Sequence, residues 1–279
     1  KIAKQLKLKL QKESCFINSL RCFPQRTLAL NKTIAPYWRK LFLSLFFVPF
    51  PALALTSTTF KDLDLSIAVG PSWYKASNGY VQPYPTETDL DHVDHVTKST
   101  SYQIGIGYHL FAEQLANRQF FNDFLIQLNA SQSSATIKGD VWDAGNPSMQ
   151  YQSFKAPFTT TRLMVDIKPS LVSYMNTMFY PIAGLGIAWN RLSYTETQTT
   201  SYIGAVDAPA HTSKNLVYDL GLGLSSKITE NMRVTVEYIS THLGRMAPCD
   251  YSTSEQTVSS MPNFPVQTTT VLFGLSWRF

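Results

Sequence analysis

The last fourteen residues of the chain, 266–279, alternate between two kinds of side chain with a period of two. One face is mostly large and apolar (Thr269, Val271, Phe273, Leu275, Trp277 and Phe279), and the other is mostly small or polar, with Leu272 as the exception (Thr270, Leu272, Gly274, Ser276 and Arg278). This period predicts a β-strand with two unlike sides. The end of a soluble domain is usually polar and frayed. An apolar strand that runs to a final Phe therefore indicates that one face meets a solvent other than water.

Seven earlier stretches alternate in the same way, at residues 62–70, 102–110, 123–131, 162–168, 183–190, 216–225 and 232–238. Each is near the ~9–11 residues that a tilted strand needs to cross a bilayer. After Ala54 no run of about eighteen apolar residues follows, so the sequence predicts no membrane-spanning helix.

The connections between these stretches alternate in length. Long polar segments are expected at about 76–98, 132–158, 193–213 and 243–266, and short links near 113–119, 171–178 and 227–231. Short periplasmic turns and long outer loops are typical of outer-membrane barrels. We therefore predict an all-β fold, an eight-stranded antiparallel up-and-down transmembrane β-barrel.

The two faces of the strands suggest what each side meets. The polar face carries charges of both signs, which we expect to pair in a narrow lumen (Asp64, Arg162, Asp166, Lys168, Asp219, Arg233, Glu237 and Arg278). The apolar face ends in aromatic residues that are typical of interfacial girdles, with Tyr180 placed only by its position before Pro181 (Trp73, Tyr102, Tyr108, Tyr180, Trp189, Tyr238, Trp277 and Phe279). The alternative is a secreted ligand-binding barrel with the apolar face inward.

The N-terminal segment differs in composition and predicts an export signal. Arg39 and Lys40 precede an apolar run at 41–50, and Ala52-Leu-Ala54 is a cleavage signature. The run is short, and Pro49 within it and Pro51 directly after it break it, which disfavours the alternative of a membrane anchor. We expect residues 1–36 to be an N-terminal extension absent from the mature protein, 37–54 to be a signal peptide, and 55–279 to be the barrel.

Charge and cysteine content exclude some functions. The net charge of +5 comes from residues 1–54, which sum to +9, whereas residues 55–279 sum to −4. The basic balance therefore does not predict nucleic-acid binding. The three cysteines, Cys15, Cys22 and Cys249, have no metal-binding spacing. We expect no cofactor, and Cys249 reads as an unpaired thiol in a loop.

Three stretches carry a family resemblance. Residues 180–189 (YPIAGLGIAW) and 220–238 (LGLGLSSKITENMRVTVEY) resemble the fifth strand and the sixth-to-seventh strand hairpin of OmpA-like and opacity-type outer-membrane β-barrels. The final FGLSWRF resembles the signal that the barrel-assembly machinery reads, which implies an assembly role for Phe273, Leu275, Trp277 and Phe279. The likeness covers residues 60–279. The chain ends with the barrel, so we expect no peptidoglycan-binding domain.

Two clusters are candidates for chemistry. Residues 89–95 hold two histidines and three acids, and imidazole and carboxylate ligands suit a divalent cation. Asp91, His92, Asp94 and His95 are thus weak metal candidates, with a hydrated acidic loop as the favoured interpretation. His211 and Ser213 share a strand face and suit a hydrolytic pair, with Asp207 or Glu237 as a conceivable orienting acid, but we do not predict an enzyme.

The resemblance implies a localisation in the outer membrane of a Gram-negative bacterium, but it spans adhesins, antigens, narrow pores and anchors. We predict a surface protein that presents its loops from a rigid scaffold, for adhesion or host interaction. The alternatives are a narrow porin-like channel gated by the lumen charges and a lipid-modifying enzyme. The expected partners are outer-membrane lipids and lipopolysaccharide, the barrel-assembly machinery, and host surface molecules.

Overall fold

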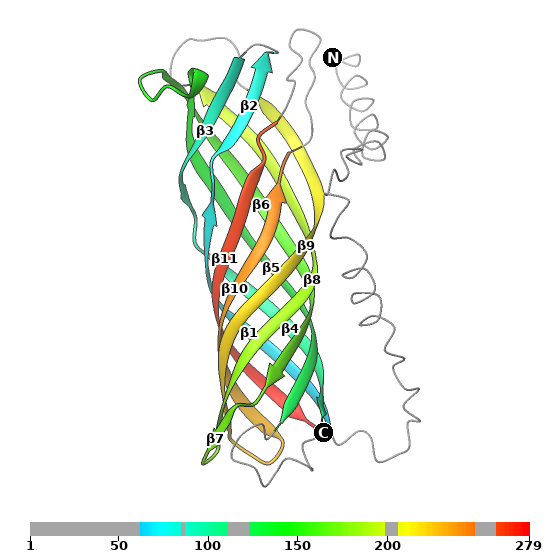
Figure 1. Ribbon diagram of the computed structural model, residues 1–279. Helices are drawn as coiled ribbons and strands as arrows, with labels where there is room; N and C mark the ends of the chain where they lie inside the picture. The colour runs from blue at the N-terminus through cyan, green and yellow to red at the C-terminus, as the bar shows by residue number, and fades with distance from the viewer. Residues whose placement is uncertain (1–61, 85–86, 111–122, 199–205, 249–260) are drawn as a thin grey trace, which may run out of the picture. The chain divides into compact units, whose positions relative to one another are not determined.

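The first and last strands lie side by side and close the barrel. β1 (Leu63–Ala76) pairs antiparallel with β11 (Phe264–Arg278), in a register that runs from Asp64↔Arg278 to Ala76↔Val266. The computed structural model describes residues 62–84, 87–110, 123–198, 206–248 and 261–279, all within the compact unit Thr59–Phe279 (Figure 1). The predicted N-terminal extension, the predicted signal peptide and Cys249 lie outside the described residues.

Eight antiparallel strands form the ring, as predicted. Their order is β5-β4-β1-β11-β10-β9-β8-β6, and the pairing of β5 with β6 closes it. The remaining ring strands are β4 (Ser99–Leu110), β5 (Phe124–Trp142), β6 (Gln150–Pro169), β8 (Thr177–Gln198), β9 (Asp207–Lys227) and β10 (Met232–Met246). No helix among the described residues is long and apolar enough to span a membrane.

Three shorter strands and one turn complete the described chain. β2 (Gly79–Tyr84) and β3 (Glu87–Val96) form a hairpin, and β3 pairs with the part of β5 that lies beyond β4. β7 (Val172–Tyr174) pairs with the start of β8. The one-turn 3-10 helix η2 (Asp143–Gly145) joins β5 to β6, and its residues Ala144 and Gly145 have positive φ.

Four strands are about twice as long as the bilayer requires. β5, β6, β8 and β9 have 19, 20, 22 and 21 residues, whereas a crossing needs ~9–11. The expectation of long loops at 132–158 and 193–213 was therefore wrong over most of the described residues, because these segments continue the strands of the barrel and leave only residues 143–149 as a described turn. The first expected loop, 76–98, holds the hairpin β2–β3 instead.

The chemistry of the two faces changes along each strand while the orientation of alternate side chains does not. Even-numbered residues of β6 point inward from Phe154 to Lys168: Asp166 and Arg162 are buried near the short-turn end, and Phe158 and Phe154 are buried further along. The odd-numbered Leu163 is exposed on the outer wall. Further up, the outward positions on β6 are polar, such as Thr159 and Lys155.

This change has a physical cause in the surroundings of the barrel. The exposed apolar side chains form a band on the outer wall, where hydrocarbon replaces water. Beyond this band the wall is in water and must be polar, so the apolar residues face inward and build a soluble-type core. That core contains Ile137, Phe154, Leu192, Tyr194, Leu243, Met246 and Phe264, all almost completely buried.

Candidate functional site

An ion pair crosses the lumen at the level of the apolar band. Lys168 of β6 points inward with its Nζ atom 2.6 Å from Oε1 of Glu237 on β10. The hydroxyl of Tyr180 on β8 donates a second hydrogen bond to the same carboxylate oxygen at 2.9 Å. All three side chains are buried. A buried charge is costly without a partner. Lys168 of β6 and Tyr180 of β8 therefore stabilise the buried carboxylate of Glu237.

Tyr180 was predicted to be an interfacial aromatic residue, and this prediction was wrong. Even-numbered residues of β8 point inward, so Tyr180 shares the lumen face with Ile182. Gly223 of β9 lies opposite Tyr180 in the register, and the absence of a Cβ there leaves room for the phenol ring. The other seven predicted aromatics are exposed or partly exposed on the wall: Trp73, Tyr102, Tyr108, Trp189, Tyr238, Trp277 and Phe279.

A second polar layer lies further along the lumen. The Arg162 guanidinium donates from Nε to Ser131 Oγ at 3.0 Å and from Nη1 to Thr241 Oγ1 at 2.7 Å. Asn129 donates from Nδ2 to Asp166 Oδ2 at 2.5 Å. These bonds link β5, β6 and β10 across the barrel, so polar side chains fill its cross-section here.

The structure places six of the eight predicted lumen charges in the buried interior: Asp64, Arg162, Asp166, Lys168, Asp219 and Glu237. Arg233 is partly buried. Arg278 is also partly buried, and it pairs with Asp62 near the end of the chain. The lumen therefore gathers these charges from β1, β6, β9, β10 and β11.

Sequence reasoning missed one buried pair at the short-turn end of the lumen. His109 Nδ1 lies 2.6 Å from Asp123 Oδ2, and His109 Nε2 lies 3.7 Å from Asp64 Oδ2. His109 alternates with apolar residues on β4, as do the predicted charges on their strands, and this signal was available. Asp123 immediately precedes β5, and only the barrel register brings it next to His109.

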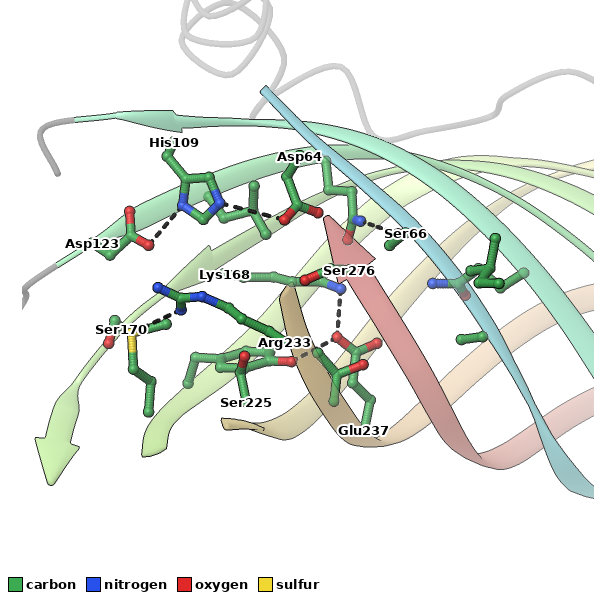
Figure 2. A pocket seen from close by; sticks show the side chains of 18 residues that line it. Asp64, Ser66, His109, Asp123, Lys168, Ser170, Ser225, Arg233, Glu237 and Ser276 are labelled. Carbon is green, nitrogen blue, oxygen red and sulfur yellow. Dashed lines mark hydrogen bonds and ion pairs between the residues drawn. The ribbon is translucent and has the colours of Figure 1, made fainter. Parts of the chain in front are cut away.

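A small cavity of about 50 Å³ lies among these side chains (Figure 2). Its lining includes Asp64, His109, Asp123, Lys168, Arg233 and Glu237, from β1, β4, β6, β10 and the residue before β5. A buried water needs roughly 10–15 Å³ on this kind of measure, so the cavity has room for a few waters. Tyr180, Ile182, Ile239 and Leu272 pack together beside it. The lumen is filled beyond this cavity by that apolar cluster and by the Arg162 layer.

Comparison with known proteins agrees with this geometry. Residues 41–279 match the family model of the outer membrane protein beta-barrel domain. The chain belongs to this family. A search of curated proteins finds no match.

Solved structures of other outer-membrane barrels are similar in fold to this family member. Neisserial surface protein A is 13% identical, with 78% of this chain and 97% of that chain covered and a TM-score of 0.37. The outer membrane protease OmpT from Escherichia coli is 11% identical, with 79% and 98% covered and a TM-score of 0.47. A major outer membrane protein from Thermus thermophilus is 12% identical, with 78% and 99% covered and a TM-score of 0.40. These likenesses concern the fold alone.

The apolar core beyond the band, which we call the extracellular core because the long strands of outer-membrane barrels extend on the extracellular side, encloses two carboxyl groups. Tyr194 of β8 lies with its hydroxyl 2.9 Å from Glu196 Oε1 and 3.2 Å from Asp91 Oδ1 of β3. The backbone N–H of Val206 donates to Glu196 Oε2 at 2.8 Å. Because the hydroxyl has one proton, it donates to only one of the two acids at a time.

Burial shifts the protonation of this carboxyl pair, which lies beyond the apolar band. Burial raises the pKa of Glu196 to about 7, and the hydrogen bonds from Val206 and Tyr194 oppose this change. Burial also raises the pKa of Asp91 well above its usual value, and the negative charges of Glu196 and Asp89 add to the effect. The pair therefore favours holding a proton near neutral pH.

The weak metal candidates do not converge. Residues 89–95 form part of strand β3 rather than the expected acidic loop, so successive side chains point to opposite faces. Asp91 is buried, whereas His92 stacks on Trp142 with ring centroids 4.1 Å apart and lies 3.3 Å from Asp94, and His95 is exposed. Within the described part of the chain, no three His, Cys, Asp or Glu residues form a group that could hold a metal ion.

The candidate hydrolytic pair lies on β9. Ser213 Oγ lies within hydrogen-bond distance of two backbone oxygens, 3.4 Å from that of Asn190 and 3.5 Å from that of Arg245. His211 is partly exposed two residues away and pairs in register with Leu192. The serine hydroxyl thus points to the neighbouring strands β8 and β10.

Proposed function

We propose that this outer-membrane barrel is a non-conducting scaffold that presents its extracellular end for adhesion to host surface molecules. The observation that carries the proposal is the filling of the lumen at two levels. Buried polar networks occupy it within the apolar band, and an apolar core occupies it beyond the band. An eight-stranded barrel has an interior just wide enough for its side chains.

The extracellular core also supports a role in presentation. Phe154 stacks on Tyr194 and on Phe264, with ring centroids 5.5 and 5.7 Å apart. These contacts join β6, β8 and β11 well beyond the apolar band and hold the top of the barrel together. A rigid scaffold that extends into water can carry exposed turns, such as residues 143–149, away from the membrane surface.

Conductance separates the scaffold from the narrow channel. We expect the protein refolded into planar bilayers to show no unitary current steps. A porin of about 16 strands, whose barrel leaves an aqueous channel, is refolded in the same way and serves as the positive control for sensitivity. Unitary steps from the parent protein under the conditions that detect this porin would exclude the closed scaffold.

Adhesion is tested by expressing the protein on a non-adherent bacterium and counting cells bound to a host-cell layer. The matched variant replaces residues 143–149, which are mostly exposed, with a Gly-Ser segment of equal length. We expect the parent to increase attachment and the variant to lose part of this gain at equal surface levels. No increase with the parent protein would refute the adhesive role and leave the filled barrel unaffected.

A further inference from the structure

Three basic residues lie close together on the outer wall, immediately beyond the apolar band. Arg191 on β8 and Arg245 on β10 are exposed, and Lys214 on β9 lies between these two strands with its side chain on the same outer face. Trp189 pairs with Lys214 and Arg191 pairs with Thr212 in the register of β8 and β9. Arg191 and Lys214 are thus diagonal neighbours on one face, which places their Cβ atoms roughly 7–8 Å apart or less.

The third cation, Arg245, is held next to Lys214 by hydrogen bonds from the side chain of Asn215 on β9. Asn215 donates from Nδ2 to the carbonyl oxygen of Arg245 at 2.7 Å and to that of Leu243 at 3.1 Å. The backbone of Arg245 therefore lies next to Lys214. A register shift between His242 and Gly244 accompanies this arrangement, after which Arg245 is exposed and Met246 is buried. Three adjacent strands thus present one cation each at neighbouring positions.

These cations have no acidic partner in the described chain. None of its salt bridges involves Arg191, Lys214 or Arg245. The acids of β8–β10 beyond the apolar band are Glu196, which is buried inside, and Asp207, which accepts a hydrogen bond from Thr195. Like charges at such spacing repel one another, so a multivalent anion bound between them would be stabilising.

The wall below the cations is apolar and exposed. Leu216 is 77% exposed, and Ile187 and Tyr218 lie near it on the same two strands. Trp189 marks the boundary, as expected of an aromatic residue at the level of the lipid headgroups. The long strands extend beyond this boundary, which identifies it as the outer-leaflet side.

We propose that Arg191, Lys214 and Arg245 form a binding site for a phosphorylated lipid of the outer leaflet. The phosphates lie against the three cations, and the acyl chains run down the wall along Ile187 and Leu216. A guanidinium and an ammonium suit this role because both donate charge-assisted hydrogen bonds to phosphate oxygens. The site does not depend on the adhesive role, since it lies on the wall and not on the exposed turns.

The test measures binding of hexaacyl diphosphoryl lipid A to the full chain refolded in neutral nanodiscs. The variant is Arg191→Gln with Lys214→Gln and Arg245→Gln. Since each basic residue near an anionic surface contributes about 1 kcal/mol, or about a factor of five, we expect the affinity to fall roughly 100-fold. The matched control, Lys98→Gln with Lys138→Gln and Lys155→Gln, removes three other cations of the extracellular part and should leave binding within a few-fold of the parent.

Three results would overturn the proposal. The first is unchanged affinity in the Arg191, Lys214 and Arg245 variant, with its heat-modifiable gel migration showing that it is folded. The second is an equal loss in the control, which would indicate attraction by overall charge. The third is equally tight binding of the dephosphorylated lipid, or displacement of the lipid by millimolar inorganic phosphate, because either would remove the requirement for a phosphate carried by a lipid.

Discussion

Lys168 and Glu237 meet inside the barrel with Nζ 2.6 Å from Oε1, although 69 residues separate them along the chain. Strands β8 and β9 lie between β6 and β10 in the ring, so the contact crosses the lumen. A lumen that a lysine and a glutamate can span together is narrow enough for side chains to fill. The ion pair therefore also shows that side chains from opposite walls meet inside the lumen.

Replacing only Glu237 of this pair should destabilise the barrel more than replacing both Lys168 and Glu237. Glu237→Leu leaves a buried lysine and a tyrosine hydroxyl without their acceptor, so we expect the free energy of unfolding to fall by about 3–5 kcal/mol. Lys168→Met combined with Glu237→Leu should recover most of this loss. The measurement is guanidine unfolding in lipid vesicles, with Glu230→Gln on an exposed turn as control. A double variant no more stable than Glu237→Leu would contradict the prediction.

Gly223→Ala should disturb the same site from β9, the strand that pairs with β8 next to Tyr180. A Cβ at this position would overlap the ring of Tyr180, so the ring must move away from Glu237. We expect a loss of about 1–3 kcal/mol in the free energy of unfolding. In a Tyr180→Leu background the same substitution should cost much less, since the ring is gone. An equal cost in both backgrounds would show that the glycine is needed for another reason.

The core beyond the membrane should behave like that of a soluble protein. Phe154→Ala removes a side chain that is 1% exposed and leaves a cavity, so we expect the free energy of unfolding to fall by about 3–5 kcal/mol. Phe273→Ala changes the same residue type on the lipid-facing wall, where acyl chains can fill the space. We expect Phe273→Ala to lower the free energy of unfolding less than Phe154→Ala does. Equal losses for the two variants in lipid vesicles would contradict the assignment of Phe154 to a protein core and of Phe273 to the lipid-facing wall.

The carboxyl pair should make stability depend on pH. Glu196 has a usual pKa of 4.5 that rises to about 7 in the folded protein, so the folded state binds more protons between these values. Stability is then full below about pH 4.5 and falls as pH rises through 7, by on the order of 3 kcal/mol. Glu196→Gln should flatten this slope, whereas Asp207→Asn on the exposed surface should preserve it. If Glu196→Gln leaves the dependence of stability on pH unchanged, Glu196 is not the group that causes it.

Part of the lumen was predictable because its signal is local. Alternation on single strands pointed to Asp166, Lys168 and Glu237 as one polar face, and each is buried. Tyr180 was assigned to the wrong face because its neighbouring proline was used instead of its parity. The partners of His109 were not predictable, since they depend on which residues of separate strands share a level.

The alternation by itself determined that the chain forms strands with two unlike faces, and the long-short order of the connections and the aromatic strand ends then favoured a barrel closed in a membrane. It also determined which side chains of a strand share a face. Only the tertiary structure decided where the membrane band ends, because an inward apolar residue and an outward one have the same local pattern. Register across the ring also decided which charges meet and which cations gather on the wall, since these pairings join residues that no short-range pattern connects.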